Sequence, residues 1–376
     1  MFLDAIKKIH KKSYRPLNII EISKKRLIDN YNYLSSLDNK LKIAPVLKSN
    51  AYSHGIKEVA TILDKINPVF FCVDSLYEAY ELLKSKIKSP ILIMGYVDPE
   101  NLSVKKLPFS YAVFGLEQLR GILKSQSQAK VHLFVDTGMH REGIRLDELE
   151  EFLKKLTDEE KNSIEGAMSH LALAENSQDP DTKKQINHFR ESVKLLRKHS
   201  IFPKHIHLGN SPGLLNNKNL KLSSLSNTSR IGRALYGISS IKNDNLKQVL
   251  RLKTHIIQIK KIKKGEKVGY DFTYQAKKDG IVAVLPIGFY DGVDRRLSNK
   301  GVVLIKNKTC PIIGRVSMNL TVVDVTSVDT IKVGDEVIVF SNNENENNVI
   351  NTAEKIGAIP YEILVHLERS MRRKVI

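Results

Sequence analysis

The sequence predicts an α/β fold in which a (β/α)8 TIM-type barrel is followed by a mainly β C-terminal domain. Between residues 42 and 232, eight short apolar runs alternate with segments that show the apolar periodicity of amphipathic helices. After Gly237 the chain changes to β-rich runs separated by turn signals, with little helical periodicity. A chain of 376 residues is long enough for one large domain and one smaller domain.

The eight runs are apolar throughout, which is typical of strands buried on both faces of a parallel sheet. They cover residues 42–48, 69–74, 91–94, 110–114, 131–136, 164–170, 205–208 and 229–232. The helical segments between them cover residues 56–63, 76–83, 116–123, 149–156 and 186–196. Eight strand–helix units favour a closed barrel. An open doubly wound sheet is kept as the alternative, because the third and eighth runs are weakly patterned.

We place the barrel domain at residues 1–245 and the β domain at residues 246–376. The β-rich runs of the second domain cover residues 254–262, 281–288, 301–307, 310–317, 320–325 and 335–341. A strand pattern at residues 18–23, followed by a helical pattern at residues 24–37, precedes the first barrel run. The first ~20 residues are therefore candidates for packing with the second domain.

Charge and cysteine content narrow the function classes. The formal net charge is +19, but the lysines are spread along the chain and no binding module accompanies them, so nucleic-acid binding is not expected. Cys72 and Cys310 lie far apart in the sequence, which predicts no disulfide framework, no metal site and a reducing compartment. No apolar run has the length of a signal peptide core or a membrane span, so we expect a cytoplasmic protein without membrane partners.

Polar residues follow the predicted strands at their carboxyl ends, where a parallel barrel builds its active site. In strand order they are Lys48, Arg141, His170, Asn210, Ser211, Arg230, Gly232 and Arg233. In low-dielectric surroundings a lysine is a good nucleophile or base, so Lys48 predicts Schiff-base chemistry. The alternative is a lysine whose side chain extends along the barrel rim to solvent.

Two loops rich in small residues, Asn210–Gly213 and Ile231–Arg233, follow the seventh and eighth runs. Phosphate groups in barrels of this kind commonly bind at these loops, where backbone N–H groups can approach the oxygens. The alternative is that both loops are ordinary turns. A lysine together with two phosphate loops points to a phosphorylated aldehyde, pyridoxal 5'-phosphate (PLP), as the cofactor.

The segment Lys48–Gly55, KSNAYSHG, resembles the cofactor-lysine motif of the alanine racemase family, which are PLP enzymes of fold type III. The similarity continues in order through residues 136–141, 168–170, 210–211, 230–232, 268–274, 288–292, 314–319 and 360–362. The resemblance implies an isomerase that interconverts L-alanine and D-alanine with PLP and two bases. The alternatives are a racemase of broader specificity, a PLP decarboxylase of the same architecture, and a non-enzymatic PLP-binding protein.

The resemblance also implies roles for individual residues. Lys48 is expected to carry the cofactor and to exchange the proton of the D-isomer, while Tyr270 exchanges that of the L-isomer. His170 is the implied hydrogen-bond partner of Tyr270 and is linked to Arg230, which faces the pyridine nitrogen of PLP. The remaining implied contacts are Tyr52, Asn210, Ser211, Gly232, Arg233 and Tyr361 for the cofactor, and Arg141 and Met318 for the substrate carboxylate. The alternatives are that Tyr52 and Tyr361 are packing aromatics and that His170 is an ordinary core histidine.

Several positions depart from the family pattern, among them Phe134, Phe289 and Asn319. Phe134 stands where many members have a carbamylated lysine that orients the arginine corresponding to Arg141, so another group must support Arg141 here. Phe289 stands where a tyrosine is usual, and Asn319 where an aspartate is usual. These changes concern the substrate and the entrance, so the substrate is less firmly predicted than the cofactor.

The resemblance further implies a head-to-tail homodimer with shared active sites, in which the β domain that carries Tyr270 reaches the barrel mouth of the other subunit, where Lys48 lies. The alternative is a contact between the two domains of one chain. The substrate partner is a small amino acid. D-Alanine supply for peptidoglycan is the biological role that the family implies.

Overall fold

The computed structural model describes residues 16–376 and divides into two compact units. One unit consists of Ile22–Leu250, Pro360–Val365 and Val375–Ile376. The other contains Arg251–Ile359, His366–Lys374 and the described residues up to Glu21. The predictions made for residues 1–15 lie outside the described residues.

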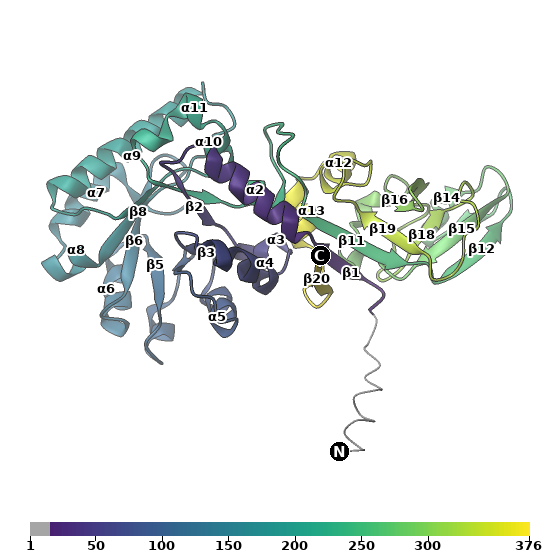
Figure 1. Ribbon diagram of the computed structural model, residues 1–376, viewed down its shortest axis with the longest axis horizontal. Coiled ribbons are helices and arrows are strands. Elements are labelled where there is room, and N and C mark those ends of the chain that lie inside the picture. The colour runs from purple at the N-terminus through teal and green to yellow at the C-terminus, as the bar shows by residue number, and fades with distance from the viewer. Residues whose placement is uncertain (1–15) are drawn as a thin grey trace, which may run out of the picture. The chain divides into compact units, whose positions relative to one another are not determined.

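The first unit is a closed barrel of eight parallel strands, as predicted (Figure 1). In order the strands are β2 (Lys42–Pro45), β3 (Phe71–Val73), β4 (Ile91–Ile93), β5 (Phe109–Val113), β6 (Lys130–Asp136), β8 (Ile164–Met168), β9 (His205–His207) and β10 (Thr228–Ile231). β10 pairs with β2, and two single bridges, Val46 to Cys72 and Gly209 to Ser229, complete the circle. The open sheet is therefore excluded.

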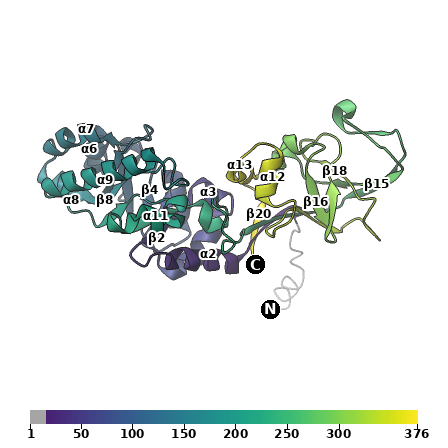
Figure 2. The same ribbon diagram turned by 90° about the horizontal axis from the view of Figure 1, so that it is seen from above.

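Helices cover the outside of the barrel, and Figure 2 shows several of them around β8. They are α2 (Lys24–Ser36), α4 (Ile56–Leu63), α5 (Leu76–Lys84), α6 (Leu116–Ser125), α7 (Leu146–Lys154), α8 (Asp158–Ser163), α9 (Pro180–Lys198), α10 (Ser211–Leu215) and α11 (Asn217–Leu220). Side-chain caps begin several of them: Ser23 caps α2, Ser75 caps α5, and Thr157 forms a capping box with Glu160 at α8. The predicted helix positions are confirmed to within three residues, except that α9 begins six residues earlier than predicted.

The barrel interior has an apolar part and a polar part. One buried apolar cluster takes a residue from each of six neighbouring strands: Ala44, Cys72, Leu92, Ala112, Phe134 and Met168. On the side of β6, β8, β9 and β10 the interior is polar, with buried His132, His207 and Arg230. Burying each large apolar side chain contributes roughly 1.5–3 kcal/mol, so the apolar part stabilises the barrel next to its polar part.

The second unit is mainly β, as predicted. Its largest sheet has the order β17-β16-β19-β11-β1-β20, and smaller sheets have the orders β12-β15-β18 and β13-β14. The strands are β1 (Ile19–Ile22), β11 (Leu250–His255), β12 (Gln258–Ile262), β13 (Lys267–Val268), β14 (Tyr274–Gln275), β15 (Gly280–Leu285), β16 (Val302–Ile305), β17 (Lys308–Pro311), β18 (Thr321–Asp324), β19 (Glu336–Phe340) and β20 (Arg372–Val375). The strand predicted near residues 18–23 thus lies in this sheet.

Two helices near the C-terminus were not predicted from the sequence. α12 (Val349–Lys355) begins at Asn348, whose side chain accepts a hydrogen bond from the backbone N–H of Asn351. α13 (Pro360–Val365) belongs to the barrel unit and packs against residues 48–52. In residues 16–376, none of the helices combines the length and the apolar character that a membrane span requires.

Candidate active site

Lys48 begins an unusual left-handed turn shortly after β2. Ser49, Asn50 and Ala51 have φ of 55°, 54° and 54°, and positive φ continues through Tyr52 and Ser53. Left-handed helical geometry costs about 1–2 kcal/mol per non-glycine residue, so surrounding contacts must hold the turn in place. Such strain is concentrated at functional sites. The strand ends at Pro45, so Lys48 lies beyond the strand and does not close it as expected.

Asn50 and Glu78 hold this turn. The side-chain oxygen of Asn50 accepts from the backbone N–H of Ile56 at 2.8 Å, and the backbone N–H of Asn50 donates to Oε1 of Glu78 at 3.0 Å. Glu78 is buried, and its second oxygen accepts from the backbone N–H of Asp74 at 3.0 Å. One carboxylate therefore ties the lysine turn to the end of β3. The amine of Lys48 stays accessible, with its Nζ 3.4 Å from an exposed oxygen of Asp74.

Tyr52 and Gly232 form a second feature of the site. A Cβ atom added to Gly232 would lie 2.5 Å from the hydroxyl oxygen of Tyr52, so only glycine leaves room for that hydroxyl. Burial raises the pKa of Tyr52 to about 12, which keeps the phenol protonated and able to donate a hydrogen bond. Tyr361 of α13 and the guanidinium of Arg233 both act electrostatically on Tyr52.

The loops after β9 and β10 present backbone N–H groups to the same end of the barrel. Ser211 and Arg233 are the first residues of α10 and of the short 3-10 helix Arg233–Tyr236. Their N–H groups have no acceptor within those helices, because the first residues of a helix lack one. Asn210 shapes the first loop, since its side-chain oxygen accepts from Gly213 N–H at 3.0 Å and its amide nitrogen donates to Leu171 O at 3.0 Å.

Arg230 lies inside the barrel, and four hydrogen bonds fix its guanidinium. Nη1 donates to Nδ1 of His207 at 2.9 Å and to the carbonyl of His207 at 2.6 Å. Nη2 donates to the carbonyl of Ser169 at 2.5 Å and to Nδ1 of His170 at 3.2 Å. Burial lowers the pKa of Arg230 to about 10, so it stays cationic at neutral pH. Among the described residues these bonds use the four terminal hydrogens and leave the Nε–H for a ligand.

His170, two residues beyond β8, is a neutral hydrogen-bond donor toward the site. Burial, and next the charge of Arg230, lower its pKa to about 3, with smaller effects from Arg141, Lys48 and Arg233. Since a guanidinium only donates, Nδ1 of His170 must accept and its one proton must sit on Nε2. The structure thus brings His170 together with four of the predicted cationic residues. The interpretation of His170 as an ordinary core histidine is disfavoured by this setting.

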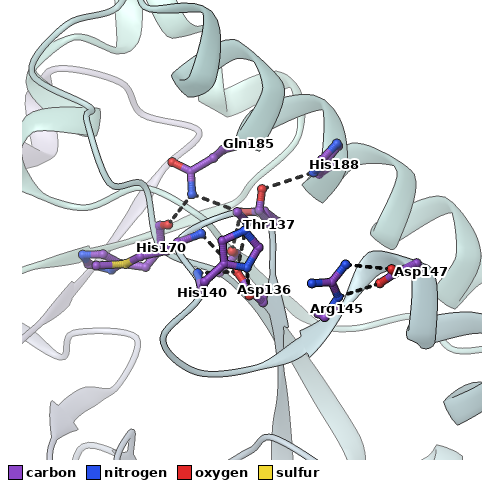
Figure 3. Close-up of polar contacts among 11 residues, drawn as sticks. Asp136, Thr137, His140, Arg145, Asp147, His170, Gln185 and His188 are labelled. Carbon is purple, nitrogen blue, oxygen red and sulfur yellow. Dashed lines mark hydrogen bonds and ion pairs between the residues drawn. The ribbon is translucent and has the colours of Figure 1, made fainter.

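Asp136 organises the loop that carries Arg141 (Figure 3). Its Oδ1 accepts from the backbone N–H groups of Gly138, Met139 and His140 at 2.9, 3.1 and 3.1 Å, and its Oδ2 lies 3.1 Å from Nδ1 of His140. Arg141 itself pairs with Glu142, whose carboxylate accepts from Nε at 2.9 Å. In the described chain a neighbouring carboxylate is therefore the ion-pair partner of Arg141.

Helix α9 braces this loop and the segment that follows β8. Figure 3 shows Gln185 and His188 of α9 pointing toward Thr137. The buried Gln185 donates to the carbonyl of His170 at 3.1 Å and accepts from Ala172 N–H at 2.9 Å, while Nδ1 of His188 lies 3.2 Å from the carbonyl of Thr137. A further ion pair, Arg145 to Asp147 at 2.8 Å, lies beyond the loop. The backbone of His170 is therefore held from outside the barrel.

Tyr270 and Met318 lie in the β unit, on neighbouring loops. The backbone N–H groups of Phe289 and Tyr290 donate to the carbonyls of Ser317 and Met318 at 3.0 and 2.9 Å, which joins the loops of Phe289 and Met318. Tyr270 and Met318 are 68% and 59% exposed, so both side chains face outward from this unit. Gly269 and Asp271 have φ of 76° and 57°, and an ion pair of 2.7 Å joins Asp271 to Arg315.

Four polar residues of the barrel interior were missed in the sequence. They are His132, Glu165, His205 and His207. The alternation of the β9 segment, HIH, does place two histidines on one face of a strand, which was the available signal. This alternation does not identify the inward face, because both faces of such a strand are buried.

Comparison with known proteins agrees with these features. The family model described as "Alanine racemase, N-terminal domain" matches residues 22–240, and "Alanine racemase, C-terminal domain" matches residues 249–375. Alanine racemase 1 of Caldanaerobacter subterraneus subsp. tengcongensis is 32% identical over 366 residues, covering 94% of this chain and 93% of the relative. The alanine racemase of Sorangium cellulosum is 34% identical over 350 residues, covering 89% and 91%.

Solved structures are similar over the same extent. The alanine racemase of Clostridium difficile 630 superposes with a TM-score of 0.86 at 28% identity, covering 97% of each chain. The alanine racemase of Bacillus anthracis with bound L-Ala-P also has a TM-score of 0.86 at 28% identity, covering 97% of this chain and 96% of the other. Both family models together span most of the described residues. The chain therefore belongs to the alanine racemase family, a family of PLP-dependent isomerases.

Proposed function

We propose that this protein is an alanine racemase that binds PLP at the mouth of its barrel. The observation that carries the proposal is the joint placement of Lys48, Arg230 and the Tyr52–Gly232 pair at the carboxyl ends of β2 and β10. An accessible amine, a fixed cation and an enclosed hydroxyl are the three kinds of group that a phosphorylated pyridine aldehyde requires. Membership in the family supports the same assignment.

The residues present fit the cofactor. Lys48 would hold its aldehyde carbon, and the remaining Nε–H of Arg230 would face its ring nitrogen. The phosphate would be held by the Tyr52 hydroxyl, the N–H groups of Ser211, Gly232 and Arg233, and Tyr361, with Asn210 shaping the loop. When bound, PLP supplies a conjugated ring that accepts the electron pair left as the Cα–H bond of the amino acid breaks.

Proton transfer is assigned to two residues on opposite faces of the substrate. Lys48 takes or returns the proton on one face, and Tyr270 does so on the other. A phenol releases a proton at neutral pH only with help, since its ordinary pKa is about 10. His170 would give that help through its Nε2–H, which Arg230 does not engage and which lies 3.4 Å from the amide nitrogen of Asn210. Arg230 remains cationic and donates a hydrogen bond without giving up a proton.

A homodimer would bring Tyr270 of one copy to the barrel of another. Exposed apolar side chains on the loops of the β unit support this: Tyr270, Phe272, Phe289, Tyr290 and Met318. A group of large apolar side chains on joined loops, each more than 40% exposed, is typical of a protein interface. Two copies related by a twofold axis would complete two sites.

The substrate carboxylate is assigned to Arg141 and to the backbone N–H of Met318. Arg141 pairs with Glu142, and Phe134 stands at the position where many family members have a supporting lysine. Cytoplasmic location and a role in D-alanine supply for peptidoglycan remain predictions.

The test is to incubate the purified protein with PLP and single L-amino acids and to separate the products by chiral chromatography. We expect D-alanine to form fastest, with serine or slightly larger residues slower. Formation of D-serine or D-lysine in excess of D-alanine would replace the alanine assignment by a broader racemase. Release of CO2 would indicate the decarboxylase.

A further inference from the structure

A hydrogen-bonded chain of four side chains crosses the barrel interior from its mouth to its base. Nη1 of Arg230 lies 2.9 Å from Nδ1 of His207, and Nε2 of His207 lies 2.7 Å from Nδ1 of His132. Nε2 of His132 lies 3.5 Å from Oε1 of Glu165. Both imidazoles are fully buried, whereas the Glu165 side chain is 26% exposed at the other end.

The direction of every hydrogen bond in this chain follows from its two ends. A guanidinium has donors only, so Nδ1 of His207 accepts and its single proton sits on Nε2. That Nε2–H donates to Nδ1 of His132, and so the proton of His132 sits on Nε2 and points at Glu165. Burial lowers the pKa of both imidazoles, which keeps each ring neutral with one proton.

Glu165 is the acceptor that closes the chain. Burial alone would raise the pKa of Glu165, but hydrogen bonds from His132 and Ser110 outweigh it and lower the pKa to about 2. The side chain is therefore an acceptor-only carboxylate at neutral pH. An amide in place of this carboxylate could donate a hydrogen bond to Nε2 of His132. The proton of His132 would then sit on Nδ1 and face the Nε2–H of His207. Such a conflict is resolved only if a bond in the chain is broken.

The hydrogen-bonded chain also explains how the buried positive charge of Arg230 is stabilised. Arg230 is 4% exposed, and its four acceptors are two carbonyls and two neutral imidazoles. A buried charge is costly unless it is paired or well hydrogen-bonded. Hydrogen bonds in a low-dielectric interior polarise and strengthen one another. The carboxylate of Glu165 at the far end of the chain therefore favours the proton arrangement in which His207 accepts a hydrogen bond from the guanidinium of Arg230.

We propose that Glu165, His132 and His207 are positioning residues that set the orientation of Arg230 from the base of the barrel. Glu165 fixes the proton direction, the two imidazoles transmit it, and Arg230 presents its Nε–H at a constant angle. The effect on the cofactor rests on the proposed function, whereas the proton arrangement itself does not.

His205 offers a matched control. Its ring stacks on that of His132 with centroids 5.8 Å apart and an interplanar angle of 11°, but it does not link the carboxylate to the guanidinium. Phe70 packs edge-on against all three imidazoles, at 5.2–5.6 Å. Within residues 16–376, no group of three or more His, Cys, Asp or Glu side chains is arranged to hold a metal ion.

The direct test is nuclear magnetic resonance of the protein labelled with 15N-histidine, without added cofactor. His132→Gln and His207→Gln spectra assign the two rings by loss of their signals. We expect both rings to be neutral and to carry the proton on Nε2 from pH 6 to pH 8, roughly one unit either side of neutrality. A proton on Nδ1 of either ring, or a charged ring in that range, would overturn the proposal.

The second test compares the PLP-loaded Glu165→Gln and His132→Gln proteins with His205→Gln. We expect the first two to shift the visible absorbance band of the bound cofactor and to lower kcat about tenfold with KM changed less than about twofold. His205→Gln should leave the band and kcat near wild type. Equal changes in all three variants would show a merely structural role and refute the proposal. A wild-type protein with no visible band would instead refute PLP binding and leave the proton arrangement standing.

Discussion

The hydroxyl of Tyr52 occupies the space that a side chain at position 232 would fill, with 2.5 Å between that oxygen and a Cβ built on Gly232. The φ of Gly232 is −104°, so backbone strain is not what requires glycine here. Glycine is required at position 232 because the hydroxyl of Tyr52 needs the space beside the backbone N–H of that residue. This is the arrangement expected where a phosphate binds between a side chain and a loop.

Gly232→Ala should therefore weaken PLP binding while the protein still folds. The methyl group must push the Tyr52 hydroxyl aside, and we expect the dissociation constant for PLP to rise at least about tenfold. Fluorescence titration with PLP measures it. Gly115→Ala is the control, because a Cβ at Gly115 meets nothing within 4 Å. Unchanged PLP affinity in Gly232→Ala would contradict the assigned phosphate site.

Asn50→Ala should destabilise the turn that carries Lys48. The substitution removes the acceptor of Ile56 N–H and places a less tolerant residue at φ 54°. We expect a loss of about 1–3 kcal/mol in the free energy of unfolding, measured by urea denaturation. Glycine adopts positive φ without strain, so Asn50→Gly loses only the hydrogen bond. It should therefore lower the free energy of unfolding less than Asn50→Ala does. Equal losses would show that backbone strain is not a factor.

Mixing of two inactive variants tests whether subunits share a site. Lys48→Ala should lose the visible absorbance of bound PLP, and Tyr270→Phe should keep it while losing about 10²–10⁴-fold in activity. If Tyr270 serves the barrel of another copy, random exchange of the two variants restores about a quarter of wild-type activity, from one intact site in half of the dimers. No recovery after confirmed subunit exchange would place both residues in sites of a single chain.

Acid should destabilise the barrel in a range set by its buried histidines. The pKa of His170 is lowered to about 3 and that of His205 to about 4, both mainly by burial, from an ordinary value of 6.5. Below pH 6.5 the unfolded chain takes up protons that the folded barrel refuses, so stability present above 6.5 is lost as the pH falls. The expected slope is up to about 1.4 kcal/mol per pH unit for each such histidine.

Urea denaturation from pH 7 to pH 5 measures this slope. His205→Gln should reduce it by removing one titrating group. A free energy of unfolding that stays constant over this range would mean that the histidines are charged in the folded state, which would also contradict their hydrogen-bond directions.

The strands of the barrel could be predicted because each is a short apolar run between helical segments, and pattern alone locates such runs. The turn at Ser49 to Ser53 could not, because five successive non-glycine residues with positive φ contradict local preference and depend on Asn50 and Glu78. Helix α12 was missed because it is short and follows a polar asparagine-rich segment, whose last residue, Asn348, proves to be its cap.

Within the candidate site, Lys48 was found by its motif, whereas the partners of Arg230 were not. Its contacts with His207, Ser169 and His170 join β8, β9 and β10, which are separated by tens of residues. Glu142 was likewise overlooked as the partner of Arg141, although it is the next residue. Motifs in the sequence identify residues that can bind or react. The side chains that orient those residues become visible only from contacts across the barrel.

Racemisation in deuterated water tests the central claim most directly. The purified protein with PLP and L-alanine in D2O should produce D-alanine with deuterium at Cα, detected by chiral separation and mass spectrometry, and D-alanine should give deuterated L-alanine in return. D-Alanine must be absent with Lys48→Ala. Recovery of only unlabelled L-alanine from the wild-type protein, or of pyruvate without D-alanine, would contradict the assignment of this chain as an alanine racemase.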